Sequence, residues 1–420
     1  MYRFWPHVAS WRQTWETEMP NSIARRRLLH AGTAASLALA AAAMPRRAAA
    51  DEAGADDPYQ PWRSFDPGQS EPLGMVHAAV LAANAHNTQP WQFCVNADRI
   101  DVCADLARNL GAMDPFRREM HLSLGCALQN LVMMADAQGR GPKLALAGGT
   151  LAEPKPDAGP LQIASVGLPG GPPVVSPLLA GVPRRHTNRA AYDPDRPVGD
   201  ALVAALPALA DPDSGARLVL LADPKARADF SAATVEATGA IIADAAMIAD
   251  SDAWFRSTNA EIASHRDGPT IDAAGLSTWM TVLAKILPAP SPERAHGIWL
   301  DRTRDVQLAT APLFGLIVVR DLYDRRQALQ AGMLWQRLHL RATLAELAAQ
   351  PINQLPERVD RERQLGLPAH AARTLADLSG DPDWHATFAF RIGWPTRPVG
   401  PSPRRELDAV IRQTACAPPA

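Results

Sequence analysis

Three short segments of this 420-residue chain concentrate the side chains that could bind a polar or anionic ligand. The first is an amide segment, residues 84–89, in which each Asn or Gln offers a hydrogen-bond donor and an acceptor from one group. The second is a basic segment, residues 184–189, where fixed cations stand beside a hydroxyl donor, as a dianion requires. Their candidate binding residues are Asn84, Asn87, Thr88 and Gln89, and Arg184, Arg185, His186, Thr187 and Arg189.

The third segment, residues 402–405, follows a strand-like run over 388–392 and a Gly-Trp-Pro turn at 393–395. Its candidate residues are Ser402, Arg404 and Arg405. Each segment also has a simpler explanation: a helix cap and turn, a solvated charge run, and a strand end with a solvated tail, respectively. We find no cysteine–histidine spacing that suggests a metal site, and no Ser-His-Asp arrangement or glycine-rich nucleotide loop.

Together the three segments resemble the nitroreductase family. In that family a Pro-Ser-x-x-Asn-x-Gln-Pro-Trp segment lines the flavin cleft, and residues 83–91 are similar, with Ala83-Asn84 in place of Pro-Ser. The basic segment resembles the family's motif for the FMN phosphate, and the C-terminal segment resembles a basic pair that closes over it. The resemblance implies FMN as cofactor, NADH or NADPH as electron donor, and a small electron-poor acceptor such as a nitroaromatic or a quinone. It implies no catalytic side chain, because the flavin N5 atom carries the hydride.

The order of these motifs resembles a fused, double-length subgroup of the family, sometimes called Acg. An ordinary subunit is about half as long, carries the amide and phosphate motifs in reverse order, and binds FMN only as a dimer. The resemblance therefore implies an α+β, nitroreductase-like fold of two pseudo-symmetric halves, each with a mainly antiparallel sheet and long central helices. It further implies a monomer with one competent flavin site and one degenerate site.

A shift of 207 residues along the sequence also suggests two halves, because it places Arg118 on Arg325 and Gly125 on Gly332. These residues lie in long helices that the apolar spacing predicts over 118–137 and 326–349. Ordinary helix periodicity explains the match as well as a duplication does. The other predicted elements are helices at 75–85, 198–209 and in a block over 224–262, and strands at 91–95, 100–103, 161–166, 216–221 and 313–319.

The N-terminus resembles a twin-arginine signal peptide. Arginines at 25–27 precede an apolar run over 31–44 that is too short and too rich in alanine to span a bilayer stably, and 48–50 suits cleavage before Asp51. We therefore predict export by the twin-arginine machinery, a periplasmic location and a translation start at Met19; the alternative is an uncleaved amphipathic anchor. The predicted organisation is a signal peptide at 1–50, a flexible arm at 51–70, a first half at 71–170, a second half at 171–410 and a tail at 411–420.

Composition limits the other functions that the chain could have. Hydrophobic residues make up 47% of the sequence, which is enough for a sizeable core, and 42 Lys and Arg balance 44 Asp and Glu. The chain therefore lacks the overall positive field that attracts nucleic acid. Two alternatives to an oxidoreductase function remain. One is an exported flavin-storage protein with a covered FMN, whose lid would come from the insertion at 251–292, and the other is a flavin-free interaction module.

Overall fold

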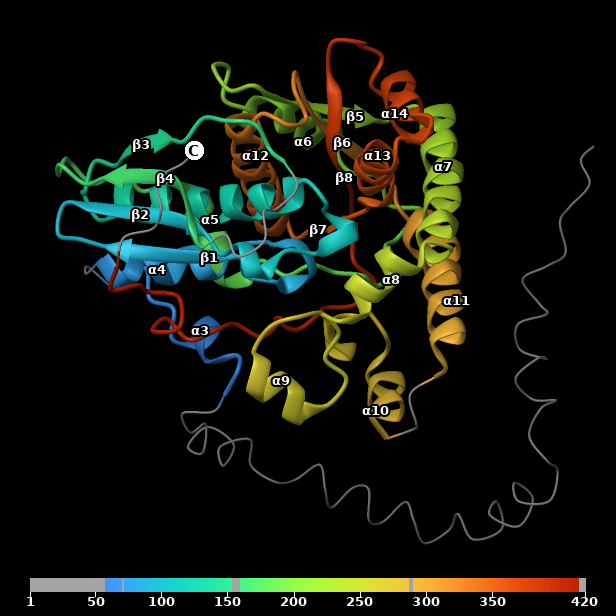
Figure 1. Cartoon of the computed structure of the whole chain (residues 1–420), viewed down its shortest axis with the longest axis horizontal. Coiled ribbons are helices and arrows are strands. Elements are labelled where there is room, and N and C mark those ends of the chain that lie inside the picture. The colour runs from blue at the N-terminus through green and yellow to red at the C-terminus, as the bar shows by residue number, and fades with distance from the viewer. Residues whose placement is uncertain (1–56, 70–71, 153–158, 287–289, 415–420) are drawn as a thin grey trace, which may run out of the picture. The chain divides into compact units, whose positions relative to one another are not determined.

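The computed structural model describes residues 57–69, 72–152, 159–286 and 290–414. In this part, two four-stranded antiparallel sheets pack with helices between and around them (Figure 1). The fold is thus α+β, as the sequence predicts. The predicted signal peptide and the start at Met19 lie outside the described residues.

Both sheets have the same strand order. The first is β1-β2-β4-β3 and the second is β5-β6-β8-β7, and all neighbouring strands are antiparallel. In each sheet, a 20-residue helix follows the second strand and leads to the third: α5 (Arg118–Ala137) in the first and α12 (Arg325–Leu344) in the second. The strands are β1 (Trp91–Val95), β2 (Arg99–Ala104), β3 (Lys143–Leu146), β4 (Leu161–Gly167), β5 (Ala216–Leu221), β6 (Leu313–Val319), β7 (Ala348–Pro351) and β8 (His385–Gly393).

The two sheets differ in how helices cover them. Strand β6 is buried along its whole length, because α12 packs on one side of its sheet and other helices of the second half pack on the opposite side. The first half joins β1 to β2 by a short turn, whereas the second half inserts a helical segment between β5 and β6. The remaining helices are α3 (Gln60–Arg63), α4 (Pro72–Val80), α6 (Asp200–Ala205), α7 (Pro224–Ile242), α8 (Ala245–Asp252), α9 (Asn259–His265), α10 (Thr278–Ile286), α11 (Pro292–Arg302), α13 (Gln354–Leu365) and α14 (His370–Ser379).

Helices α5 and α12 cross at two glycines that make equivalent contacts. A Cβ atom on Gly125 would lie 2.0 Å from the carbonyl oxygen of Leu329, and one on Gly332 would lie 1.9 Å from that of Leu122. The 207-residue shift converts each of these contacts into the other. Contacts exchanged in this way are the mark of a two-fold, isologous interface.

Two polar pairs near this crossing are exchanged by the 207-residue shift in the same way. The Gln336 amide donates to Asn130 at 2.9 Å, and the Arg337 guanidinium donates to Gln129 at 2.7 Å. The shift again converts one pair into the other. Repeated strand order and exchanged contacts together confirm two pseudo-symmetric halves with long central helices.

Two predicted helices end earlier than their apolar spacing suggested. Helix α4 stops at Val80 instead of Ala85, and the backbone is extended at Asn84 (φ −158°, ψ 153°). Helix α12 stops at Leu344 instead of residue 349, because Glu346 adopts a left-handed conformation (φ 59°) and the chain then pairs with β8 as strand β7. At α12 the alanine-rich run satisfies a helical pattern and a buried strand equally well, so spacing alone missed where the helix ends.

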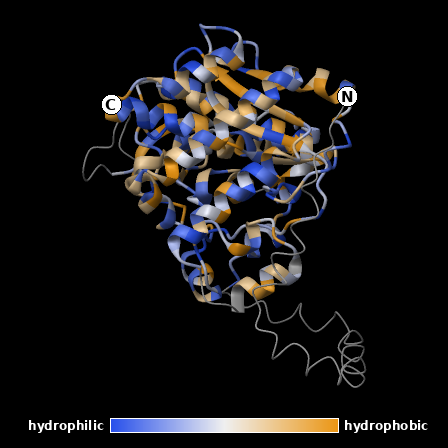
Figure 2. Ribbon diagram, turned by 90° about the vertical axis from the view of Figure 1, so that its right-hand side faces the viewer, coloured by the Kyte–Doolittle hydropathy of each residue, from blue (hydrophilic) through white to orange (hydrophobic). Residues whose placement is uncertain are grey.

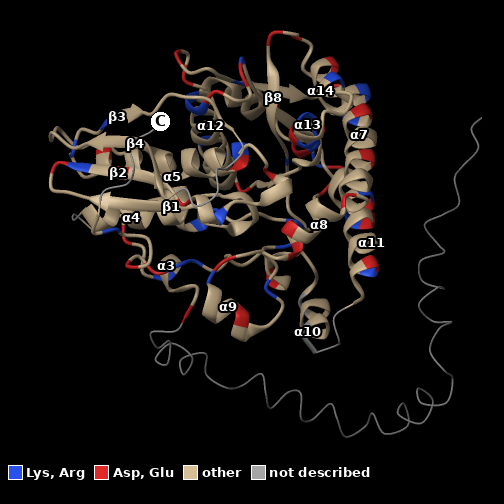
Figure 3. Cartoon of the chain, viewed as in Figure 1, with Lys and Arg blue, Asp and Glu red and all other residues tan. Residues whose placement is uncertain are grey.

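The apolar core is continuous across the two halves. One cluster of buried residues joins α4, α5 and the first sheet to α12 and the second sheet, and another lies between the second sheet and helices α7, α13 and α14. Figure 2 shows hydrophobic residues along the strands of this core, and Figure 3 shows basic and acidic residues interspersed on the outer helices α7 and α11. Among the described residues, no single helix has the length and hydropathy to cross a membrane; α7 and α8 qualify only as a pair bent by 86°.

The described part of the predicted flexible arm, residues 57–69, is packed against the core. Trp62 is 8% exposed, and its indole nitrogen donates to the carbonyl oxygen of Ser402 at 2.8 Å. The carbonyl oxygen of Pro58 accepts from the Arg404 amide at 2.8 Å, and that of Pro61 lies 2.6 Å from His77 Nε2. This stretch, called the arm below, is therefore an ordered part of the fold, in contrast to the prediction.

Candidate functional site

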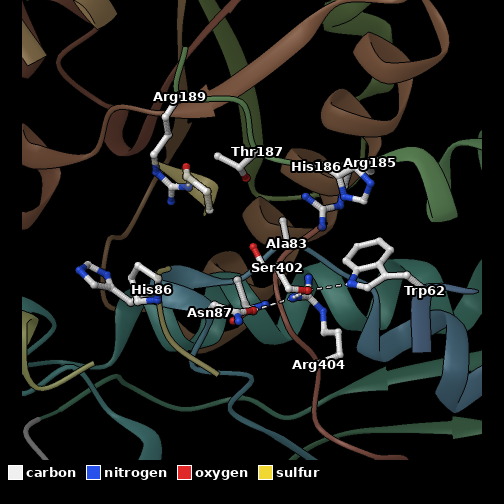
Figure 4. A pocket seen from close by; sticks show the side chains of 13 residues that line it. Trp62, Ala83, His86, Asn87, Arg185, His186, Thr187, Arg189, Ser402 and Arg404 are labelled. Carbon is white, nitrogen blue, oxygen red and sulfur yellow. Dashed lines mark hydrogen bonds between the residues drawn. The ribbon is translucent and has the colours of Figure 1, made fainter. Parts of the chain in front are cut away.

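One pocket brings together residues from all three candidate segments (Figure 4). It lies where the chain after α4, the connection between the two sheets and the C-terminal segment meet, and two other parts of the chain complete it. Its lining residues are Trp62, Ala83, Asn84, His86, Asn87, Arg185, His186, Thr187, Arg189, Pro269, Ala273, Ser402 and Arg404.

The amide segment reaches this pocket through an unusual backbone. His86, Asn87 and Gln89 have φ values of 45°, 51° and 50°, in the left-handed region that residues other than glycine rarely adopt. Side-chain contacts hold this conformation: Asn84 Oδ1 accepts from the Gln89 amide at 2.8 Å, and Ser123 Oγ accepts from the Ala85 amide at 2.9 Å. Such strain persists where the surroundings fix it, and it clusters at functional sites.

Three arginines face the pocket without a carboxylate partner among the described residues. Arg185 is 3% exposed, and one of its nitrogens donates to the carbonyl oxygen of Leu81 at 3.2 Å. Arg404 is 2% exposed and donates only to uncharged oxygens, including Asn87 Oδ1 at 2.6 Å. Arg189 donates to the carbonyl oxygen of Ala273 at 3.2 Å. Buried cations are normally paired with an anion, so Arg185 and Arg404, together with the half-buried Arg189, form a positive site that no carboxylate of the described residues neutralises.

Burial and mutual repulsion disfavour the charged forms of these groups. Burial lowers the pKa of Arg185 to about 10, and burial and the nearby Arg185 hold the pKa of Arg404 well below its usual range. Burial, followed by the charges of Arg185 and Arg404, lowers the pKa of His186 to about 3, so its imidazole is neutral at pH 7. Arg185 Nε and His186 Nδ1 are also buried with no hydrogen-bond partner. A bound dianion would pair with these cations and oppose their pKa shifts.

The insertion between β5 and β6 covers the other side of the pocket. Its residues 266–275, called the strap below, contribute Pro269 and Ala273 to the lining. The Gly268 amide donates to the Asn87 carbonyl oxygen at 3.2 Å, and Asn87 Nδ2 lies 3.3 Å from the Gly268 carbonyl oxygen. The strap lies within the insertion at 251–292 that the sequence suggested as a lid.

Four of the predicted site residues do not line the pocket. Gln89 is fully buried, and its side chain binds Arg266 of the strap and the Arg405 amide. The Thr88 carbonyl oxygen accepts from Arg108, and Arg405 donates to carbonyl oxygens outside the lining. Arg184 is on the surface, where it pairs with Glu346. The hydrogen bonds of Thr88, Gln89 and Arg405 connect segments around the site, whereas the Arg184 ion pair is exposed on the surface.

Sequence reasoning missed five lining residues: Trp62, Ala83, His86, Pro269 and Ala273. His86 lies inside the amide segment, and its position between two candidate amides was a usable signal. Trp62 lies in a polar stretch that suggested disorder, although a tryptophan there was itself a sign of packing. Pro269 and Ala273 have no side-chain chemistry that a sequence search could detect.

The donor set fits a phosphate group better than it fits an entire cofactor in this closed arrangement. Three guanidinium groups and the Thr187 hydroxyl surround the pocket, yet the cavity measures only about 30 Å³. That space admits a few water molecules at most, whereas pockets for drug-sized ligands measure roughly 300–1,000 Å³. A whole flavin therefore requires a wider pocket than this arrangement provides. In the described part of the chain, no group of three or more His, Cys, Asp or Glu residues could hold a metal ion.

Comparison with known proteins gives the site a context. No protein-family model matches the chain. Two curated proteins of Mycobacterium tuberculosis, from strains CDC 1551 / Oshkosh and H37Rv, are each 28% identical over 342 residues, which span 79% of this chain and 88% of the relative. Both carry the name "Putative NAD(P)H nitroreductase". The chain is thus similar to nitroreductases.

Solved nitroreductases also match the chain. The FMN- and NADPH-dependent nitroreductase NfnB from sphigopyxis sp. strain HMH has a TM-score of 0.36 at 19% identity, covering 57% of this chain and 100% of its own. NfnB from Mycobacterium smegmatis, solved in complex with NADPH, has a TM-score of 0.35 at 17% identity, covering 55% of this chain and 95% of its own. The sequence similarity to the curated relatives supports the nitroreductase resemblance, whereas the fused subgroup and the twin-arginine signal remain predictions.

Proposed function

We propose that this protein is an FMN-dependent oxidoreductase of the nitroreductase type, which uses NADH or NADPH to reduce small electron-poor acceptors such as nitroaromatics or quinones. The observation that carries the proposal is the convergence of three arginines without carboxylate partners and a strained amide segment on one pocket. The names of the curated relatives support the same reaction class. When bound, FMN would supply the redox chemistry by accepting a hydride and passing it on.

The chain's own residues would bind and orient the cofactor. Arg185, Arg189 and Arg404 would hold the phosphate, and the Thr187 hydroxyl would donate to it. Asn84 and Asn87 would offer donors and acceptors to the polar edge of the ring system and the ribityl chain. No side chain has to act as a nucleophile or base. The strap would exclude water from the pocket when closed.

Spectroscopy of the purified full chain tests this proposal. We expect blue-light absorption maxima of bound flavin, and bleaching of these maxima when NADPH or NADH is mixed in anaerobically. Adding a quinone or a nitroaromatic should then restore the oxidised spectrum. A chain that binds no flavin would contradict the cofactor assignment, and flavin that neither donor reduces would contradict the enzyme assignment while leaving the binding site intact.

We further propose that the fused halves make the protein a monomer produced by internal duplication, and that the twin-arginine machinery exports it to the periplasm. The exchanged contacts of α5 and α12 support the first part, because they supply within one chain the interface that two ordinary subunits would form. The arginines at 25–27 before the apolar run support the second. Cell fractionation with and without a working twin-arginine system tests this export. We expect the mature chain in the periplasmic fraction only when that system works.

A further inference from the structure

The aromatic side chain of the arm contacts both buried arginines at one end of the pocket. The Trp62 ring centroid lies 4.7 Å from the guanidinium carbon of Arg404 and 5.8 Å from that of Arg185. The His186 ring meets the indole edge-on, with 4.8 Å between the ring centroids. Figure 4 shows this group at one end of the pocket, with His86 and Arg189 toward the other. A tryptophan ring is the best aromatic partner for a cation, so Trp62 partly compensates two charges that no carboxylate neutralises.

Hydrogen bonds of the arm hold Trp62 in this position beside the two arginines. Its indole nitrogen donates to the Ser402 carbonyl oxygen at 2.8 Å, and the neighbouring Pro58 carbonyl oxygen accepts from the Arg404 amide at 2.8 Å. The arm and the C-terminal segment therefore fix each other beside the pocket. A guanidinium can stack by its face on an aromatic ring while it donates N–H bonds in its own plane. Arg185 Nε has no hydrogen-bond partner, so Trp62 and a phosphate group can both contact this arginine at once.

We propose that Trp62 closes the phosphate end of the pocket, so that the site retains a flavin monophosphate and excludes a flavin dinucleotide. This inference rests on the proposed function, because it takes the buried arginines as the phosphate site. FMN ends at its phosphate, whereas FAD continues from that phosphate into a second phosphate and an adenosine. The indole, which is 8% exposed, lies against both Arg185 and Arg404 and would block an extension that left the phosphate on this side. Trp62 is therefore a positioning residue for the arginines and a determinant of cofactor specificity.

Fluorescence titrations of the deflavinated full chain with FMN, riboflavin and FAD test this proposal. Trp62→Ala should weaken FMN binding about tenfold, because the arginines lose their aromatic support. It should change riboflavin binding less than about twofold, since riboflavin has no phosphate, and it should narrow the preference for FMN over FAD at least about fivefold. Trp62→Phe keeps an aromatic face and fills most of the space, so it should retain most of the FMN affinity and the discrimination against FAD.

Trp384 provides a matched control elsewhere in the fold. It is 5% exposed, and its ring centroid lies 4.0 Å from the guanidinium carbon of Arg217 and 4.4 Å from that of Arg320. Trp384→Phe removes an indole of similar burial that makes the same kind of cation–π contact outside the pocket lining. We expect it to leave all three flavin affinities unchanged.

The outcomes separate this inference from the proposed function. If the parent chain binds FMN and both Trp62 variants bind all three flavins as tightly as the parent does, the proposed role of Trp62 is wrong. The proposed flavin site would then still hold. Equal losses of FMN and riboflavin affinity would also overturn it, because they would show a general disturbance of the pocket. If the parent binds no flavin, the proposed function fails and the inference fails with it. If Trp62→Ala does not fold, Trp62→Phe and the parent's ratio of FMN affinity to FAD affinity test the proposal instead. A parent that binds FAD as tightly as FMN contradicts it.

Discussion

Arg185 should oppose folding of the flavin-free protein and favour binding of FMN, so replacing it should move stability and affinity in opposite directions. The depression of its pKa to about 10 corresponds to a cost of roughly 3 kcal/mol for keeping the cation buried. Because burial lowers this pKa, the unfolded chain holds the proton more tightly, and the full cost applies at every pH below about 10. Arg185→Met removes the charge and keeps much of the volume, but leaves the Leu81 carbonyl oxygen without the hydrogen bond from Arg185, a loss of about 1–3 kcal/mol.

The net expectation for Arg185→Met is a flavin-free protein that is as stable as the parent or more stable by up to about 2 kcal/mol. Its FMN affinity should fall roughly 10- to 150-fold, the equivalent of one charge-assisted phosphate contact of about 1.5–3 kcal/mol. Chemical denaturation with and without FMN, together with fluorescence titration, measures both quantities. The shift in stability that saturating FMN produces should shrink in the variant accordingly.

Arg184→Met is the matched control for this experiment. Arg184 belongs to the same basic segment, yet it lies on the surface and pairs with Glu346. Its replacement should leave the FMN affinity unchanged. The reasoning would be refuted if Arg185→Met bound FMN as tightly as the parent, or if Arg184→Met lost as much affinity as Arg185→Met.

Four further predictions concern stability, assembly and processing. Gly332→Ala places a Cβ atom 1.9 Å from the Leu122 carbonyl oxygen, so we expect the free energy of unfolding to fall by up to about 2 kcal/mol, even after the better helix propensity of alanine is counted. Gly239→Ala on α7, where nothing lies within 4 Å, should instead raise the free energy of unfolding by about 0.5–1 kcal/mol. Denaturant titration measures both. Burial and nearby carboxylates raise the pKa of Glu357 to about 8, so the folded chain retains a proton that the unfolded chain releases near pH 4.5, and stability should fall as pH rises from about 4.5 to 8. Glu357→Gln should flatten this dependence and raise stability at pH 8 by more than ~1.4 kcal/mol, and an unchanged pH profile would contradict the assignment. Light scattering of the FMN-loaded chain should show a monomer, and a flavin-dependent dimer at micromolar concentration would contradict the fused-halves proposal. Mass spectrometry of the uncleaved precursor should find Met19 as its first residue, and any peptide from residues before it would refute that start.

The sequence predicted those parts of the structure that local patterns determine. The β1–β2 hairpin and strands β4, β5 and β6 appear within a residue or two of their predicted bounds, because alternation or unbroken apolar runs between turn residues mark a strand. Convergence of the three candidate segments followed from family resemblance, since no local pattern indicates that Arg185 and Arg404 meet. Their shared pocket depends on long-range packing that only the structure displays.

Long-range contacts also explain what the sequence did not reveal. Glu346 adopts a left-handed conformation that usually favours glycine, so the end of α12 carries no sequence signal. The polar composition of the arm suggested disorder, yet a few contacts of Trp62 and Pro58 to the C-terminal segment hold it in place. Gln89 matched the family motif, but the strap and the C-terminal segment use its hydrogen-bonding capacity. In each case distant partners, rather than local propensity, decide the conformation or role.

The pseudo-symmetry relates residues of the core and of the edge of the site, but not the segments that line the pocket. We therefore expect only one pocket of this kind to bind a flavin. The Ala85 amide donates to Ser123 Oγ at 2.9 Å, and in the second half the Gly215 amide donates to Gln330 Oε1 at 3.2 Å, at the position that the 207-residue shift assigns to Ser123. After Ala85 the first half inserts the rest of the amide segment before β1, whereas β5 begins immediately after Gly215. The loop before Gly215 carries the exposed carboxylates of Asp211 and Asp213, which would repel a phosphate. The halves therefore share the framework that builds the interface, while only the first half carries an amide segment that lines the pocket.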